Sequence, residues 1–117
     1  MIQGHLAKKL VEKYGEENVV VEADAGFGKR IDIAVKRSNG LDFYEIKTCS
    51  SAKQCIREGI GQLLEYSYWP GSQKADRLII VGEGKLDQAA KQFIEMLQSQ
   101  FNIPIEYLKF SNSLRIN

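Results

Sequence analysis

The sequence predicts a single α/β domain, a mixed β-sheet flanked by helices in the order α-β-β-β-α-β-α-β. Segments with apolar residues at helical spacing alternate with strand-like segments along the whole chain, residues 1–117. Ser38-Asn39-Gly40 is a hairpin signal between two of the strand-like segments. Leu78 to Val81 form a continuous apolar run, which is typical of a parallel strand covered on both faces.

The N-terminal half is predicted to contain one helix and three strands. We expect a helix over residues 2–14, strands over 19–22, 31–36 and 41–48, and a glycine-bearing loop over 25–29. Gly15 ends the helical periodicity. Asn and Gly tolerate the positive φ of tight hairpin turns, so Asn39-Gly40 is expected to join the second and third strands.

The C-terminal half is predicted to contain two helices and two strands. We expect a helix over residues 51–68, a strand over 78–81, a helix that Asp87 caps, and a strand over 103–108. Trp69-Pro70-Gly71 ends the first of these helices, and Pro104 favours the start or an edge of the last strand.

Composition limits the classes of function. Sixteen basic and fifteen acidic residues give a net charge of +1, so a polyanion would have to meet a local patch rather than a generally basic surface. Cys49 and Cys55 are too few for a disulfide scaffold, and no segment is long and apolar enough to cross a bilayer. We therefore expect a cytoplasmic protein with reduced thiols and no membrane partner.

The third strand, Asp42-Phe-Tyr-Glu-Ile-Lys-Thr48, carries two charges where a core strand would be apolar. A two-residue Asn39-Gly40 turn would place Asp32 opposite Lys47 and Ala34 opposite Glu45. Asp32, Glu45 and Lys47 would then share one face of the sheet. Two carboxylates and an ammonium group there are costly to desolvate unless they neutralise one another, bind a metal or face a cleft. A simple cross-strand ion pair is the structural alternative.

This pattern resembles the PD-(D/E)xK (restriction-endonuclease-like) nuclease superfamily, whose signature is an acidic residue on one strand and (D/E)-x-K on the next. The matching residues are Asp32 in "RIDIAV" and Glu45-Ile46-Lys47 in "FYEIKT". In "GQLLEY", Gln62 and Tyr66 are similar to a Gln-x-x-x-Tyr element of some of these nucleases. Ile31 stands where the signature has Pro. The resemblance implies a restriction-endonuclease-like core over nearly the whole chain.

The resemblance implies a metal-dependent nuclease that hydrolyses phosphodiester bonds of nucleic acid, with DNA as the expected substrate and endonucleolytic cutting as the expected mode. Mg²⁺, or Mn²⁺ in its place, would be held by Asp32, Glu45 and the backbone carbonyl of Ile46. Lys47 would orient or deprotonate the attacking water. Two neighbouring carboxylates favour its ammonium form, so orientation and charge neutralisation are the expected roles.

Other residues are candidates for supporting roles. Gln62 and Tyr66 share a face of the predicted helix 51–68 and would support the metal site and contact the substrate backbone, unless that face is only solvated. Glu12 is the candidate further metal ligand or else a solvated charge. Lys29 and Arg30 precede the Asp32 strand and would contact phosphates, or lie in a solvated turn.

Two other classes of function stay open from the sequence. One is a catalytically silent nuclease-like module that binds nucleic acid or a protein partner. The other is a regulatory or assembly domain that uses the Gln62 and Tyr66 face for a protein. A nuclease that cuts both strands with one site often dimerises, so a homodimer and a place within a larger protein are both compatible with the sequence.

Overall fold

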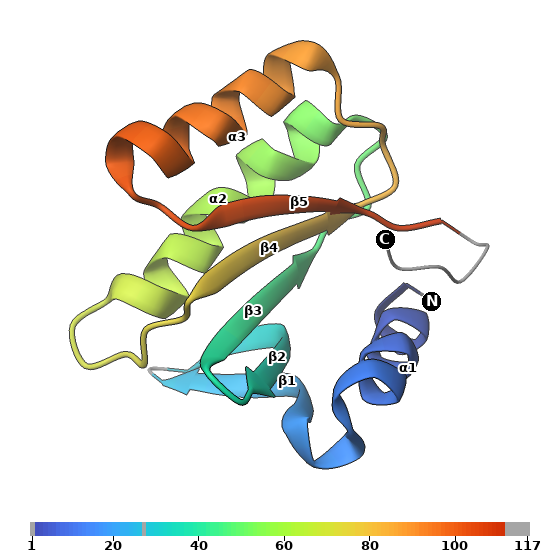
Figure 1. Cartoon of the computed structure of the whole chain (residues 1–117), viewed down its shortest axis with the longest axis vertical. Helices are drawn as coiled ribbons and strands as arrows, with labels where there is room; N and C mark the ends of the chain where they lie inside the picture. Colours follow the sequence, from blue (N-terminus) through green and yellow to red (C-terminus); the bar gives the residue numbers. More distant parts are fainter. Residues whose placement is uncertain (1, 27, 112–117) are drawn as a thin grey trace.

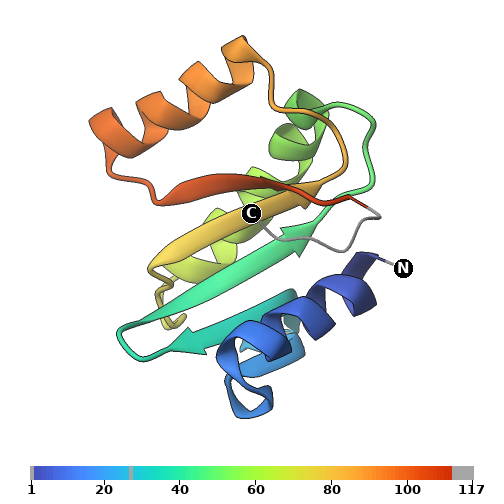
Figure 2. The same ribbon diagram turned by 45° about the vertical axis from the view of Figure 1, so that its right-hand side comes forward.

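The computed structural model describes residues 2–26 and 28–111 and has three layers, with one helix on one face of a sheet and two on the other (Figures 1 and 2). The elements are α1 (Ile2–Tyr14), the 3-10 turn η1 (Glu16–Asn18), β1 (Val19–Gly26), β2 (Lys29–Arg37), β3 (Gly40–Ile46), α2 (Ala52–Tyr68), β4 (Arg77–Gly82), α3 (Gln88–Phe101) and β5 (Ile105–Lys109). The predicted order of helices and strands is therefore confirmed.

The five strands form one mixed sheet in the order β1-β2-β3-β4-β5. β1, β2 and β3 pair antiparallel, whereas β3, β4 and β5 pair parallel. The parallel connections run through α2 and α3, because parallel neighbours need a crossover rather than a tight turn. β3 is thus the strand at which the antiparallel half of the sheet meets the parallel half.

Two apolar clusters, one on each face, hold the layers together. The α1 face is built on Leu6 and Leu10, which pack against sheet residues such as Ile33 and Val81. The other face is built on α2 and α3 with alternate residues of the same strands, among them Leu78 and Ile80. β4 is apolar along its length because its side chains enter both clusters, as the unbroken run predicts.

The predicted cap of α3 is confirmed, and α2 has a cap of the same kind that was not predicted. The Ser51 hydroxyl accepts a hydrogen bond from Gln54 N–H at 3.1 Å, and the Asp87 carboxylate accepts one from Ala90 N–H at 2.8 Å. These side chains satisfy N–H groups that the first helical turn leaves without an intrahelical acceptor. α2 ends at Tyr68, directly before the predicted stop.

The expected loop over residues 25–29 is wrong, because most of it belongs to a second hairpin. Asp24 pairs with Arg30 and Gly26 with Lys29, so β1 and β2 run on past their predicted ends. Gly26 and Gly28 have φ angles of 86° and 74°, which suit a tight strand connection. Residue 27 of the predicted loop lies outside the described residues.

The expected register of the β2–β3 hairpin is also wrong, by two residues. Arg37 pairs with Gly40, so the turn consists of Ser38 and Asn39, and Ala34 lies opposite Phe43 instead of Glu45. Gly40 does not have a positive φ. It is needed for space, since a Cβ there would lie 2.6 Å from Arg37 Nη2 and 3.0 Å from Asp76 Oδ2. A shift of two residues preserves the face of every side chain.

Two further predictions concern the thiols and the absence of a membrane-spanning segment. Cys49 and Cys55 are free thiols in the described chain. Within residues 2–26 and 28–111, no helix combines the length and apolar character needed to span a bilayer.

Candidate functional site

The site is built around Glu45 and Lys47 at the C-terminal end of β3. Their side chains lie on one side of the strand, because residues two apart share a face. Lys47 Nζ lies 3.5 Å from Glu45 Oε2, and the Glu45 side chain is only 6% exposed. β3 ends at Ile46, earlier than predicted, but Lys47 N–H still donates to the Val81 carbonyl at 2.8 Å. This bond to β4 fixes the position of Lys47.

Asp32 enters the site where β2 separates from β3. The last strand pair on this side is Ile33–Tyr44, and beyond it Ile46 N–H donates to Asp32 Oδ2 at 2.8 Å. The Asp32 carboxylate thus takes the place of a backbone acceptor in the opened ladder. The N–H and C=O of one strand residue point to the same edge, so the Ile46 carbonyl opens toward the same gap.

A backbone distortion on β1 lies level with Asp32. The β1–β2 pairs Val21–Ile33 and Ala23–Ile31 flank Glu22, whose φ is 53°. This left-handed conformation is unfavourable for a residue with a side chain. Backbone strain of this kind clusters at functional sites. Here it lies beside the position where β2 stops pairing with β3.

The negative charges at the site influence one another. Burial, followed by the nearby negative charge of Asp32, raises the pKa of Glu45 to about 7, although Lys47 acts in the opposite direction. Burial and then the charges of Glu45 and Asp32 raise the pKa of Tyr66 as well. Tyr66 on α2 is therefore within electrostatic range of both carboxylates. The site is closed on one side by α2.

Two oxygen atoms at the site are buried without a hydrogen-bond partner, Glu45 Oε1 and Gln62 Oε1. The Gln62 amide donates from Nε2 to the Tyr66 hydroxyl at 3.5 Å, which leaves its carbonyl oxygen without a donor. A buried acceptor with no donor is costly, and a cation or a proton would remove the cost. These two oxygens are open acceptors that a cation, a proton or a water molecule would satisfy.

The available donors suit a hard divalent cation. The carboxylates of Asp32 and Glu45, the Ile46 carbonyl and the Gln62 carbonyl are all oxygen ligands, which Mg²⁺ and Mn²⁺ prefer. Among the described residues, no group of three or more His, Cys, Asp or Glu side chains could hold a metal ion. Two carboxylates are nevertheless sufficient for Mg²⁺, which usually keeps several waters and takes one or two carboxylates from the protein.

The structure places the remaining predicted residues around this centre with different degrees of contact. Lys29 and Arg30 lie on β2, where Lys29 Nζ is 3.8 Å from Glu65 Oε1 and Arg30 Nη1 donates to the Glu22 carbonyl at 3.3 Å. Glu12 is exposed on α1. It is nine residues from Gln3, the α1 residue that reaches Asp32, which is roughly 13 Å along the helix. Glu12 is not brought together with the other candidates.

Gln3 is a contact that the sequence reasoning missed. Its side-chain Nε2 donates to the Asp32 carbonyl at 3.1 Å, which ties α1 to the position where β2 diverges. The signal was present in the sequence, because Gln3 precedes Leu6 and Leu10 at helical spacing and so lies on the buried stripe of α1. A polar side chain on an apolar stripe usually has a partner in the core.

Cys55 is a second missed contact. Its thiol on α2 donates toward the carbonyl of Cys49 at 3.4 Å and that of Lys47 at 3.8 Å. The segment after β3 is thereby held against α2, so the position of Lys47 depends on both β4 and α2.

Comparison with known proteins does not place the chain in a family. No family model, curated protein or solved structure matches it.

Proposed function

We propose that this chain is a metal-dependent nuclease with a restriction-endonuclease-like core, acting on phosphodiester bonds of DNA. The observation that supports the proposal best is the position of the Asp32 carboxylate. It lies in the gap between β2 and β3 and accepts from Ile46 N–H, beside a buried Glu45 that has an unsatisfied oxygen. A cross-strand ion pair alone would need neither the opened ladder nor the unsatisfied oxygen.

Asp32, Glu45 and the Ile46 carbonyl would hold Mg²⁺ or Mn²⁺, with Gln62 Oε1 as a further oxygen nearby. Bound there, the cation would supply charge stabilisation on the phosphate and activation of a water. Lys47 carries three N–H donors on a restrained side chain, so it is suited to orient the attacking water and to neutralise charge on the phosphate oxygens. The Tyr66 hydroxyl is suited to donate to a phosphate at the edge of the site.

The proposal is tested by a cleavage assay on plasmid, single-stranded and branched DNA and on RNA, with Mg²⁺, Mn²⁺ or a chelator. Glu45→Gln and Lys47→Met should each reduce cleavage by about 100-fold or more, because each removes a charge that acts on the transition state. Glu95→Gln, an exposed carboxylate on α3, is the matched control and should cut like the parent.

Thermal unfolding with and without Mg²⁺ gives a second readout that does not depend on activity. The cation should raise the melting temperature of the parent protein but not that of Glu45→Gln, because a ligand that binds only the folded state stabilises it. Cleavage that survives in both site variants would overturn the proposal. A folded parent that binds Mg²⁺ and cuts none of the substrates would favour the silent nucleic-acid-binding module.

A further inference from the structure

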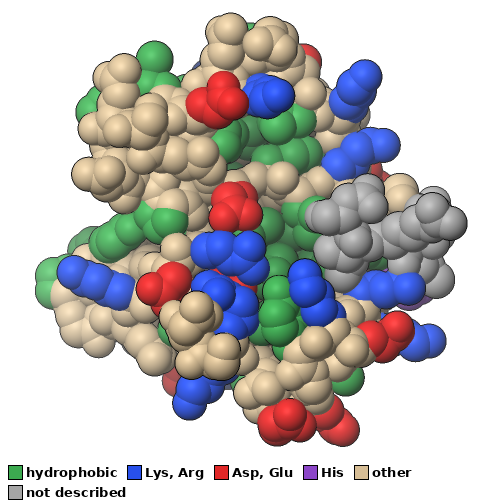
Figure 3. Space-filling model, in the orientation of Figure 1, with side chains coloured by type: hydrophobic (Ala, Val, Ile, Leu, Met, Phe, Trp, Pro, Cys, Tyr) green, Lys and Arg blue, Asp and Glu red, His purple; other side chains and the backbone are tan. Residues whose placement is uncertain are grey.

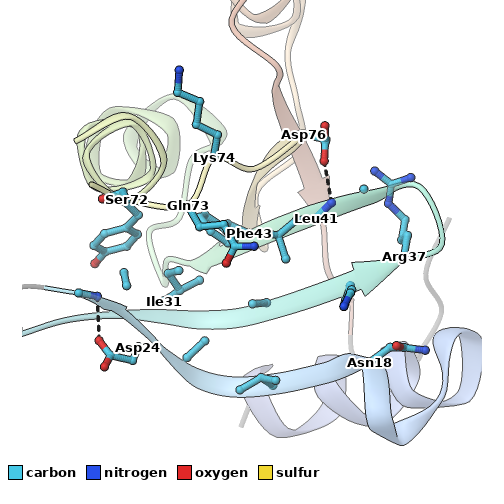
Figure 4. Close-up of a pocket in the computed structure, with 18 of the residues that line it drawn as sticks. Asn18, Asp24, Ile31, Arg37, Leu41, Phe43, Ser72, Gln73, Lys74 and Asp76 are labelled. Atoms are coloured by element: carbon cyan, nitrogen blue, oxygen red, sulfur yellow. Dashed lines mark hydrogen bonds between the residues drawn. The ribbon is translucent and has the colours of Figure 1, made fainter. Parts of the chain in front are cut away.

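A groove crosses the antiparallel half of the sheet and is lined at one end by Tyr66. It has a volume of ≈ 820 Å³ and lies between the β1-β2-β3 strands and the loop over residues 71–76 (Figure 4). Its floor is apolar and consists mainly of Ala23, Ile31, Ala34, Leu41 and Phe43. We call this cavity the hairpin groove.

The hairpin groove is continuous with a smaller cavity of ≈ 210 Å³ beside the end of α2. The two cavities share Ala25, Gly26, Tyr66 and Ser72, and the smaller one adds Lys29 and Trp69. Tyr66 lines both cavities, and its hydroxyl accepts a hydrogen bond from Gln62 Nε2 of the candidate site at 3.5 Å. A molecule lying in the groove would therefore reach Tyr66 at the edge of the site.

The walls of the groove combine apolar, aromatic and polar surface. Trp69, which lines the smaller adjoining cavity, is 54% exposed, although large aromatic side chains are usually well covered. In Figure 4 the Gln73 amide points toward the groove, whereas the Lys74 side chain extends outward from the loop. Lys36 also lies along the rim of the groove. The apolar surface thus lies inside and these ammonium groups outside.

Charge alone does not explain this surface. The net charge of the chain is +1, and basic and acidic side chains are interspersed on the face shown in Figure 3. Several charges around the groove are already paired: Arg37 donates to Asp42, and Asp76 Oδ2 accepts from Leu41 N–H at 2.8 Å. A ligand of the groove must gain its affinity largely from contacts with the apolar and aromatic surface.

We propose that the hairpin groove binds an unpaired nucleic-acid strand, so that the substrate of the site carries a single-stranded segment. This inference rests on the proposed nuclease function. An unpaired strand exposes the faces of its bases, which stack on aromatic and apolar side chains, and its phosphates remain outside near Lys36 and Lys74. A duplex hides those faces between stacked pairs and would leave the apolar floor uncovered.

The test is binding and cleavage of a labelled oligothymidylate beside a duplex of the same length. Binding is measured by fluorescence anisotropy with chelator present, so that the substrate stays intact, and cleavage is measured with Mn²⁺. Gln73→Ala changes an exposed residue of the groove and Trp69→Ala an exposed residue of the adjoining smaller cavity, and the folding of both variants is checked by circular dichroism. Phe93→Ala is the matched control, because Phe93 is an exposed aromatic residue on α3, 47% accessible.

The single strand should bind more tightly than the duplex, and Trp69→Ala should weaken single-strand binding about ten-fold. Phe93→Ala should leave binding unchanged. Equal or tighter duplex binding, unaffected by Trp69→Ala, would overturn this inference even if cleavage still requires Glu45 and Lys47. Groove-dependent binding of the single strand without cleavage of any substrate would support the groove and overturn the nuclease. A folded parent that neither binds the single strand nor cleaves any substrate would overturn both the groove inference and the nuclease proposal.

Discussion

Burial and the neighbouring Asp32 charge raise the pKa of Glu45 to about 7, from an ordinary value of 4.5. Between these two values the folded protein keeps a proton that the unfolded chain has released. The free energy of unfolding should therefore fall as pH rises from about 4.5 to 7 and stay low above that interval. The contribution is on the order of 3 kcal/mol, since the pKa rises by about 2.5 units and each unit corresponds to about 1.4 kcal/mol.

Glu45→Gln should remove this part of the pH dependence. The amide cannot ionise, so the variant should be more stable than the parent at pH 8 and nearly equal to it at pH 4.5. Urea unfolding at several pH values measures the difference, with Glu95→Gln as the exposed control. A stability difference that does not vary with pH would mean that Glu45 is not protonated in the folded protein near neutral pH.

At the scale of single residues, the sequence predicted that Glu45 and Lys47 share a face, because strand alternation is a local rule. It placed Asp32 opposite Lys47, whereas the ion pair of Lys47 is with Glu45. The position of Asp32 was predicted only in part. Its carboxylate occupies the gap between strands and binds Ile46 N–H, which depends on where β2 leaves the ladder. That departure involves Glu22 on a third strand and Gln3 on α1, and no local pattern near Asp32 encodes either contact.

At the scale of elements, the segments that form helices and strands could be predicted well from the sequence, but the register between strands could not. The cap at Asp87 is a local signal and was predicted, whereas the equivalent cap at Ser51 was not. The predicted register of the β2–β3 hairpin was displaced because Gly40 was interpreted as a turn residue with a positive φ. It is instead a strand residue over which Arg37 and Asp76 pack, and Asp76 lies 36 positions farther along the chain.

The two glycines of α2 provide a prediction at this scale. A Cβ on Gly59 would lie 3.3 Å from Ile80 Cγ1, whereas a Cβ on Gly61 would meet nothing within 4 Å. Gly61→Ala should therefore stabilise the protein by about 1 kcal/mol, because alanine is the better helix former. Gly59→Ala should gain less or lose stability, because β4 must move to accept the methyl group. Urea denaturation of the two variants measures the difference. A Gly59→Ala variant as stable as Gly61→Ala, or more stable, would contradict this packing.

At the scale of the whole molecule, the order of elements could be predicted because each segment carries its own periodicity. The way in which the two halves of the sheet are joined could not be predicted. Arg37 on β2, Asp42 on β3, Arg77 on β4 and Glu106 on β5 form a chain of ion pairs across four strands. Their order in the sequence does not show that they meet, since the parallel half is assembled through two crossover helices.

Asp42 is the centre of that chain and supports the last prediction. Its carboxylate is fully buried and accepts hydrogen bonds from Arg37 and from Arg77, at 2.7 to 3.1 Å. Burial alone would raise the pKa of Asp42, but the hydrogen bonds from Arg77 and Arg37 outweigh it and hold the pKa below 3.8. Asp42 thus stabilises the fold above about pH 4, and this stabilisation is lost as pH falls through its lower folded value.

Asp42→Asn should destabilise the protein at pH 7 by about 3 kcal/mol, because two guanidinium groups lose their shared counter-charge at a position where water cannot replace it. The loss should shrink as pH falls from about 4 toward the lowered folded pKa of Asp42, because the unfolded parent takes up a proton there while the folded carboxylate still resists it. Asp76→Asn is the matched control, because Asp76 is exposed and accepts one hydrogen bond, which the amide oxygen can still accept. Urea unfolding at pH 7 and pH 3 measures both variants. Equal losses for the two variants at pH 7 would show that the four-strand chain of charges does not couple the halves of the sheet.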